Sequence, residues 1–161
     1  MSLNKQTNLD AVISIINEKL DAGGTVIFTP NGTSMLPMLR DGKDVVMLKK
    51  PEGRLHLFDI PLYKRENGTY VLHRVIGFDK DGSYILCGDN QFVKEKGIND
   101  SMIIAVLTGF ERKGKSYSTK SFSYRLYVIF WYCTRFFRHV FRSVKYRMGV
   151  KRKNRKRTVT E

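Results

Sequence analysis

A serine in a tight turn and a histidine in a β-rich run are the two residues of this chain that could together do chemistry. Ser34 lies in Gly32-Thr33-Ser34-Met35-Leu36-Pro37-Met38-Leu39, and His73 lies in Leu72-His73-Arg74-Val75. A serine hydroxyl becomes a nucleophile when a neighbouring base takes its proton, and histidine is the side chain that titrates near neutral pH. The pair therefore predicts serine nucleophile chemistry.

Each of these two residues has a structural alternative. Ser34 could cap a short helix over residues 36–39, because serine oxygens accept bonds from the first N–H groups of a helix. In a strand, His73 would share a face with Val71 and Val75, and a histidine in such a place is more often a hydrogen-bonded core residue than a base. The sequence keeps both alternatives open.

The elements that would position the pair are short β-rich runs broken by turn residues. The predicted strands cover residues 25–29, 44–48, 60–64, 70–78, 83–87 and 103–110. Glu66-Asn67-Gly68 and Asp79-Lys80-Asp81-Gly82 favour hairpin turns, because Asn, Asp and Gly tolerate positive φ. The pattern predicts a mainly β domain with antiparallel strands over residues 25–113.

Residues 1–24 form a predicted N-terminal helix that packs on this domain. Its apolar residues follow helical spacing and end before Gly23-Gly24. Residues 1–7 are polar, and no apolar segment typical of a secretory signal follows, so we expect no N-terminal membrane anchor. Residues 114–121 are polar and aperiodic, which indicates a linker.

The net charge of +14 is concentrated at one end of the 161 residues. Residues 1–124 hold 17 Lys and Arg against 14 Asp and Glu, whereas residues 125–161 hold 12 against 1. The length suits one domain with an appendage. Cys87 and Cys133 are too few for a disulfide scaffold or a zinc site, which fits a reducing compartment. The sequence has no metal-ligand constellation and no phosphate-binding loop, so we expect no metal and no cofactor.

The basic end contains a predicted amphipathic helix over residues 122–150 and a polybasic tail over residues 151–161. An apolar stripe at helical spacing runs through Leu126, Ile129, Cys133, Phe136, Phe137, Val140, Phe141, Val144 and Met148. The opposite face carries Arg135, Arg138, Arg142 and Lys145. Spanning a bilayer takes about 20 apolar residues, and the fully apolar run here is shorter.

We therefore expect this helix to lie at a membrane interface, on the cytoplasmic face or in the cytoplasm. Tyr127, Trp131 and Tyr132 would sit at headgroup depth, and the basic residues would contact anionic lipid. The alternative is that the stripe packs on the β domain or on another chain. Nucleic acid is not expected as a partner, because the aromatic residues fall mostly in the apolar stripe.

Three motifs in order resemble those of the signal peptidase I family, in the clan that includes LexA-like self-cleaving repressors. The segment around Ser34 resembles the nucleophile box, Tyr70-Val71-Leu72-His73-Arg74-Val75-Ile76 resembles the base box, and Gly88-Asp89-Asn90 resembles the box that follows it. Family members carry lysine or histidine before the Arg-Val pair, and this chain resembles the histidine type. The resemblance covers about residues 25–112.

This resemblance implies an antiparallel signal-peptidase or LexA-like fold and a role for each matched residue. Ser34 would attack a peptide bond in a peptide or protein precursor, His73 would act as the base, and Asp89 would orient the imidazole. A purely structural Gly-Asp-Asn turn is equally compatible with Asp89. The Ser34 N–H with Thr33 would bind the oxyanion, and Met35 and Pro37 complete the nucleophile turn.

The chain departs from the family pattern at two places. Phe58 stands where the family usually has a turn glycine, and the N-terminal membrane anchor of signal peptidases is not expected here. Among the other histidines, His56 is a rival base that lacks the Arg-Val context, and His139 lies among the tail arginines, which predicts a surface position.

Two further functions stay open from the sequence. A self-cleaving regulator would need a DNA-binding domain, and the first 24 residues are too short for a helix-turn-helix module. The other is a catalytically silent protein of the same fold that binds a membrane surface or nucleic acid.

Overall fold

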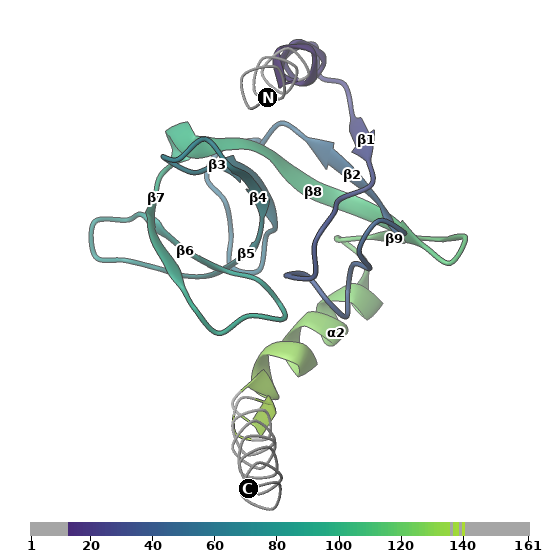
Figure 1. Cartoon of the computed structure of the whole chain (residues 1–161), viewed down its shortest axis with the longest axis vertical. Helices are drawn as coiled ribbons and strands as arrows, with labels where there is room; N and C mark the ends of the chain where they lie inside the picture. The colour runs from purple at the N-terminus through teal and green to yellow at the C-terminus, as the bar shows by residue number, and fades with distance from the viewer. Residues whose placement is uncertain (1–12, 136, 139, 141–161) are drawn as a thin grey trace, which may run out of the picture. The chain divides into compact units, whose positions relative to one another are not determined.

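The computed structural model describes residues 13–135, 137, 138 and 140, which divide into two compact parts between Ser121 and Phe122. Nine antiparallel strands make up the described β-rich part (Figure 1). Their bounds are β1 Val26–Phe28, β2 Val45–Lys49, β3 Pro61–Lys64, β4 Tyr70–Leu72, β5 Arg74–Phe78, β6 Tyr84–Cys87, β7 Glu95–Ile98, β8 Ile103–Arg112 and β9 Lys115–Ser118. A 3-10 helix, Asp100–Met102, precedes β8. The prediction of a mainly β, antiparallel domain is confirmed.

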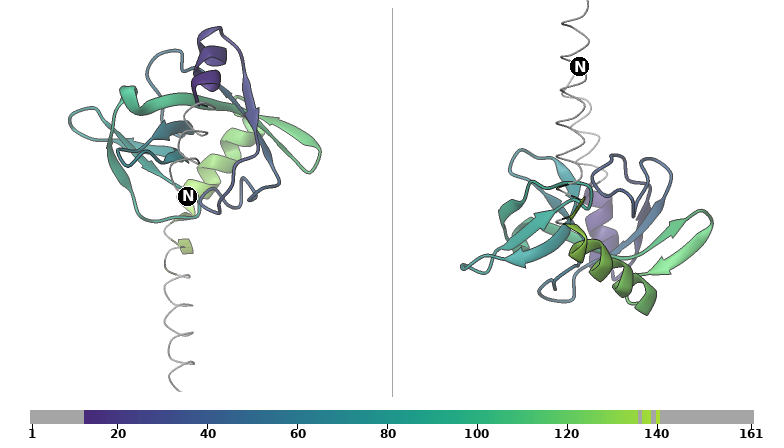
Figure 2. Two further views of the ribbon diagram at one scale, coloured as in Figure 1. Left: turned by 45° about the horizontal axis from the view of Figure 1, so that its top comes forward. Right: turned by 90° about the horizontal axis from the view of Figure 1, so that it is seen from below.

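The strands form two sheets. The larger sheet has the order β1-β2-β8-β3-β4, with β9 also paired to β8, and the smaller sheet has the order β5-β6-β7. The ten-residue strand β8 pairs with β2, β3 and β9, so it is the central strand of the larger sheet. The hairpin of β8 and β9 extends away from the rest of the sheet, as the light green ribbon in Figure 2 shows.

Side chains from both sheets meet in one buried cluster. Tyr84 and Leu86 alternate along β6, as expected where one face of a sheet is covered. The cluster consists of Leu55, Tyr63, Val75, Tyr84, Leu86 and Ile98. Removing this apolar surface from water stabilises the contact between the sheets, and it fixes β3 of the larger sheet against β5, β6 and β7.

His73 lies where the chain passes from one sheet to the other. The predicted strand over residues 70–78 is in fact two strands, since β4 belongs to the larger sheet and β5 to the smaller one. The Val75 N–H bonds to the Asp59 carbonyl at 2.8 Å, which turns the chain toward its second sheet. The spacing of apolar residues does not reveal where a β-rich run leaves one sheet and joins another, so the sequence did not predict this break.

The N-terminal helix is described over residues 13–21 and ends as predicted at Gly23-Gly24. Gly23 has a φ of 75°, and its N–H bonds to the Leu20 carbonyl at 3.0 Å, while the Gly24 N–H bonds to the Lys19 carbonyl at 2.9 Å. This is the glycine-dependent termination that satisfies the last carbonyls of a helix. Leu20, at 2% exposure, packs into the β-rich part.

The predicted linker over residues 114–121 is wrong, because β9 occupies half of it. Lys113 and Gly114 both have positive φ, 53° and 71°, which is the geometry of a two-residue hairpin loop. All four residues of β9 are exposed, so the strand has no alternation of apolar and polar residues by which it could be recognised.

The C-terminal part contains α2, Phe122–Cys133, which begins where the sequence pattern predicts a helix. Helical backbone continues at residues 135, 137, 138 and 140. Within the described residues, no helix is both long enough and apolar enough to cross a membrane. The rest of the predicted helix, up to residue 150, and the polybasic tail lie outside the described residues.

Candidate active site

Ser34 lies in a compact turn after β1. The backbone bends at Gly32, whose φ of 111° favours glycine and whose N–H donates to Asp41 Oδ1 at 2.6 Å. Residues 34–38 form turns and not a helix, so the alternative in which Ser34 caps a helix over residues 36–39 is wrong. The half-buried serine side chain lines a pocket.

The Gly88-Asp89-Asn90 motif holds this turn in place. Gly88 passes so close to it that a Cβ there would lie 2.7 Å from the Ser34 carbonyl oxygen and 3.1 Å from Ser34 Cβ. The Asn90 N–H donates to the same carbonyl at 2.8 Å, and its side-chain amide donates to the Thr33 carbonyl at 3.1 Å. Two motifs that are distant in sequence therefore touch, and the second fixes the first.

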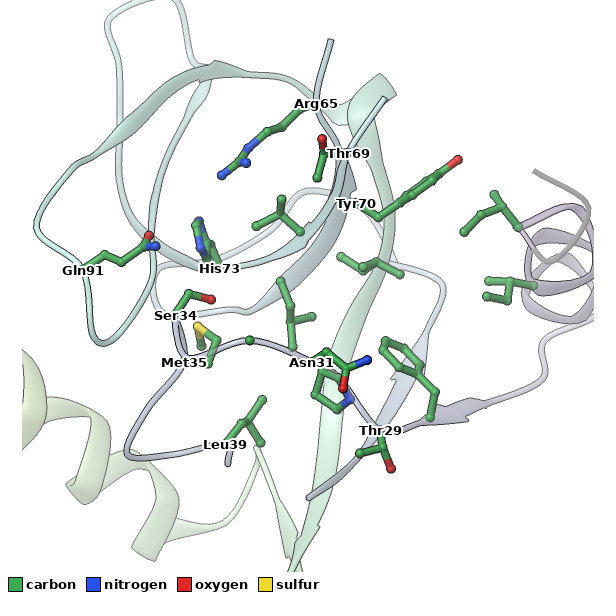
Figure 3. A pocket seen from close by; sticks show the side chains of 18 of the residues that line it. Thr29, Asn31, Ser34, Met35, Leu39, Arg65, Thr69, Tyr70, His73 and Gln91 are labelled. Atoms are coloured by element: carbon green, nitrogen blue, oxygen red, sulfur yellow. The ribbon is translucent and has the colours of Figure 1, made fainter. Parts of the chain in front are cut away.

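His73 is 1% exposed and lines the same pocket as Ser34. Figure 3 shows the two side chains next to each other, with Gln91 beside them. Within the described residues, the polar contacts of His73 run to Tyr63 and Glu95, and none joins it to Ser34 Oγ. Hydrogen bonds of this kind are often long before substrate binds and tighten in the complex.

The Nδ1 atom of His73 faces Glu95, the first residue of β7. Nδ1 lies 3.0 Å from Glu95 Oε1 and 3.2 Å from the Tyr63 hydroxyl, and that hydroxyl donates to Glu95 Oε2 at 2.7 Å. Because Tyr63 gives its single proton to the carboxylate, Nδ1 is the donor in the neutral imidazole. Nε2 then holds the lone pair, which is the tautomer that a general base needs.

Arg65 also binds the Glu95 carboxylate. Its Nε donates to Oε2 at 2.8 Å and its Nη2 donates to Oε1 at 2.5 Å, which is bidentate pairing. Burial acts to raise the pKa of Glu95, but the bonds from Arg65 and Tyr63 leave it below its usual value. Burial is also the largest influence on His73 and lowers its pKa, while Glu95 opposes this effect. The His73 imidazole is therefore neutral and lies beside the anionic carboxylate of Glu95.

Asp89 does not occupy the position that the resemblance implies for it. Its two carboxylate oxygens accept bonds from Arg74 Nε and Nη2, both at 2.7 Å, and each side chain is 3% exposed. Arg74 also donates to the Phe58 carbonyl at 3.1 Å. The geometry therefore favours the structural interpretation of Asp89 over the catalytic one, because the carboxylate at His73 Nδ1 belongs to Glu95.

The other residues predicted for the nucleophile turn have different surroundings. Thr33 is exposed, Met35 is 4% exposed and lines the pocket, and the Pro37 carbonyl accepts a bond from Arg112. The N–H groups of Thr33, Ser34 and Met35 make no hydrogen bond to any described residue. These three donors can therefore serve an oxyanion that forms beside Ser34.

The remaining sequence candidates lie elsewhere. His56 has an exposed side chain 3.7 Å from Asp59 and does not line the pocket, so it is not the base of this site. Phe58 has a φ of 75°, a backbone conformation that favours glycine. His139 lies outside the described residues.

The pocket beside Ser34 and His73 has a volume of about 790 Å³. Its walls come from the N-terminal helix through Ile13 and Ile16, from β1 and the segment after it, and from β4. Within the described residues, no group of three or more His, Cys, Asp or Glu side chains could hold a metal ion.

The described members of the predicted membrane-interface set, Tyr127, Trp131, Arg135 and Arg138, recur every three or four residues along α2 and its continuation, so they share one side of the helix. Trp131 stacks on Tyr127 with 6.1 Å between ring centroids, and the Arg138 guanidinium lies 3.2 Å from the centroid of the Trp131 ring. Arg135 is partly exposed. Arg142 and Lys145 lie outside the described residues.

Sequence reasoning missed Glu95, Tyr63 and Arg65. Glu95 opens a strand that was not predicted, and no periodicity or motif marks it. Tyr63 and Arg65 lie at the end of a predicted strand, but only the pairing of β3 with β4 and of β6 with β7 brings them to His73. The one available signal was an acidic residue shortly after the Gly-Asp-Asn motif.

Comparisons of the chain with models of protein families, with curated proteins and with solved structures found no match. The antiparallel β architecture follows from the strand pairing of the described residues, and the resemblance to signal peptidases depends on three sequence motifs.

Proposed function

We propose that this chain is a serine endopeptidase of signal-peptidase type that cleaves peptide or protein precursors. Ser34 is the nucleophile, His73 is the general base, and Glu95 orients the imidazole. One observation carries the proposal: Ser34 and a neutral His73, which are distant in sequence, line one pocket, and the Glu95 carboxylate lies 3.0 Å from His73 Nδ1. A helix cap and a core histidine would not need this arrangement.

The proposed reaction follows from the positions of the atoms. Ser34 Oγ attacks the scissile carbonyl carbon while His73 Nε2 takes its proton, and Glu95 stabilises the imidazolium that forms. The N–H groups of the Ser34 turn bind the oxyanion, and losing one such donor typically costs about 3 kcal/mol of barrier. His73 then protonates the leaving amine and activates the water that releases the acyl group.

The strands around the pocket favour an extended peptide as substrate. β1 and β4 are the outer strands in the order of the larger sheet, and Phe28 of β1 and residues 70–72 of β4 line the pocket. An outer strand can pair its backbone with an extended peptide. A polypeptide entering here would pass Ser34 and His73.

Cleavage of a fluorogenic leader peptide containing Ala-x-Ala tests this function. We expect turnover by the full chain, and a loss of about 10³-fold or more in Ser34→Ala and in His73→Ala. His56→Ala is the matched control and should keep full activity, because that imidazole lies outside the pocket. Cleavage that persists in Ser34→Ala would exclude the assignment, and a self-generated fragment without peptide turnover would favour the regulator instead.

A further inference from the structure

One face of α2 and its continuation is an exposed apolar stripe. Phe122 is 75% exposed, Phe130 66% and Phe137 62%, which is unusual for large apolar side chains gathered on one helix face. The apolar stripe consists of Phe122, Leu126, Ile129, Phe130, Cys133, Phe137 and Val140. These positions recur at three, four and seven residues, so they share one side of the helix.

The aromatic residues on the other side of the helix make contacts within it. Trp131 lies five positions from Leu126, which is about 140° round the helix axis. Its ring is covered by Tyr127 and Arg138, and its carbonyl accepts a bond from the same arginine. Trp131 is partly covered by these contacts, and the apolar stripe is the more exposed side of the helix. The position of Trp131 at headgroup depth stays a prediction.

The charge of the C-terminal part decides what kind of partner fits this stripe. Residues 125–161 hold 12 Lys and Arg against 1 Glu. A second copy of the chain would bring two strongly basic segments together, and like charges would oppose that contact. A nucleic acid would satisfy the charge but would leave the apolar stripe in water. An anionic bilayer satisfies both, because headgroups attract the basic residues and acyl chains cover the apolar ones.

We infer that the apolar stripe of α2 is a docking face for an anionic phospholipid bilayer, on which the chain lies as a peripheral protein. The stripe inserts at the boundary between headgroups and acyl chains, and the basic residues provide long-range attraction. This inference does not rest on the peptidase assignment. Ser34→Ala should bind vesicles as the unchanged chain does, so the two proposals can fail separately.

Cys133 offers a direct probe of insertion. It is exposed in the middle of the stripe, whereas Cys87 is buried, so a thiol-reactive fluorophore such as NBD labels the full chain at one place. With vesicles of phosphatidylcholine and phosphatidylglycerol, we expect a blue shift and brighter emission. Vesicles of phosphatidylcholine alone should give much less change. No shift with the anionic vesicles would overturn the inference.

Flotation of unlabelled protein provides the matched comparison. Leu126→Asn with Ile129→Asn should lower the affinity for anionic vesicles by about tenfold or more, because two apolar side chains that insert into the bilayer are lost. Ile27→Asn with Val93→Asn changes two apolar residues of the β-rich part that are at least as exposed, and it should leave binding unchanged. Equal recovery of both double variants would contradict the inference. The inference would also be contradicted if the unchanged chain did not float with anionic vesicles but bound a DNA duplex. A dimer that only the Leu126→Asn, Ile129→Asn variant abolishes would contradict it too, if the unchanged chain did not float.

Discussion

Asp89 is a buried carboxylate and Glu95 is a half-buried one a few residues later, and the partners of each carboxylate indicate its role. Glu95 faces the imidazole and is held by Tyr63 and Arg65, whereas Asp89 neutralises Arg74. A motif comparison points to the aspartate because it lies in a recognisable turn. Only the register of the strands reveals the glutamate.

Exchanging each carboxylate for an amide should therefore damage different properties. Glu95→Gln should lower kcat by about 10²- to 10⁴-fold with a folded protein, because an amide can donate to Nδ1 and favour the wrong tautomer. Asp89→Asn should instead destabilise the fold by about 3 kcal/mol, since Arg74 would keep a buried charge without its anion. Peptide turnover and thermal unfolding of both variants check this. Full activity in Glu95→Gln would show that Glu95 does not orient the base.

Arg65 should set the pH range in which His73 acts. Burial lowers the pKa of His73, and the positive charge of Arg65 lowers it further, while Glu95 and Asp89 oppose these effects. The base form therefore persists below the usual value of about 6.5, and kcat/KM should fall only at lower pH.

In Arg65→Gln we expect the acid limb of kcat/KM to move to higher pH, because the pKa of His73 rises when a neighbouring cation is removed. Arg65→Lys keeps the charge and should leave the limb near its original position. The pH profiles of the two variants give the measurement. Identical limbs in Arg65→Gln and the unchanged chain would mean that Arg65 does not act on the base.

At the scale of elements, the sequence predicted most strands and missed those that depend on pairing. The runs that became β1, β2, β3, β6 and β8 carry apolar and β-branched residues. β7 contains Lys96 and Gly97, and β9 is exposed throughout, so neither has a pattern of its own. The break at His73 was also missed, because a change of partner sheet leaves the residue types of the strand unaltered.

The contact between the nucleophile turn and the Gly-Asp-Asn motif gives a prediction at this scale. Gly88→Ala would place a Cβ 2.7 Å from the Ser34 carbonyl oxygen, and a backbone atom there cannot move without moving the turn. We expect turnover to fall by about 10²-fold, as for a misplacement of about 1 Å at a reacting group.

Gly77→Ala is the matched control, because its Cβ would meet Ile85 at an ordinary 3.8 Å. It should keep activity and a circular dichroism spectrum like that of the unchanged chain. If both alanine variants are equally active, the close packing of Gly88 on Ser34 does not matter for catalysis.

At the scale of the whole molecule, charge and chemistry are divided between the two parts. The candidate site lies in a part with nearly balanced charge, and the apolar stripe lies in a part with 12 Lys and Arg against 1 Glu. The composition alone predicted this division. It could not tell which face of the helix is exposed, because contacts between distant residues decide burial.

Added salt should weaken vesicle binding and leave peptide cleavage nearly unchanged. Raising the ionic strength from about 0.05 to about 0.5 M shortens the Debye length to a few ångströms and should weaken vesicle binding strongly. Cleavage of a short uncharged peptide should change little, since the ion pairs around His73 are largely buried. Parallel flotation and turnover measurements check this, and salt-independent vesicle binding would contradict the electrostatic contribution.

The nucleophile assignment of Ser34 is tested most directly by labelling the full chain with a fluorophosphonate and mapping the modified residue by mass spectrometry. We predict one adduct on Ser34 Oγ, strongly reduced labelling in His73→Ala and Glu95→Gln, and unchanged labelling in His56→Ala. A folded chain that does not react, or an adduct on a residue other than Ser34, would contradict the account.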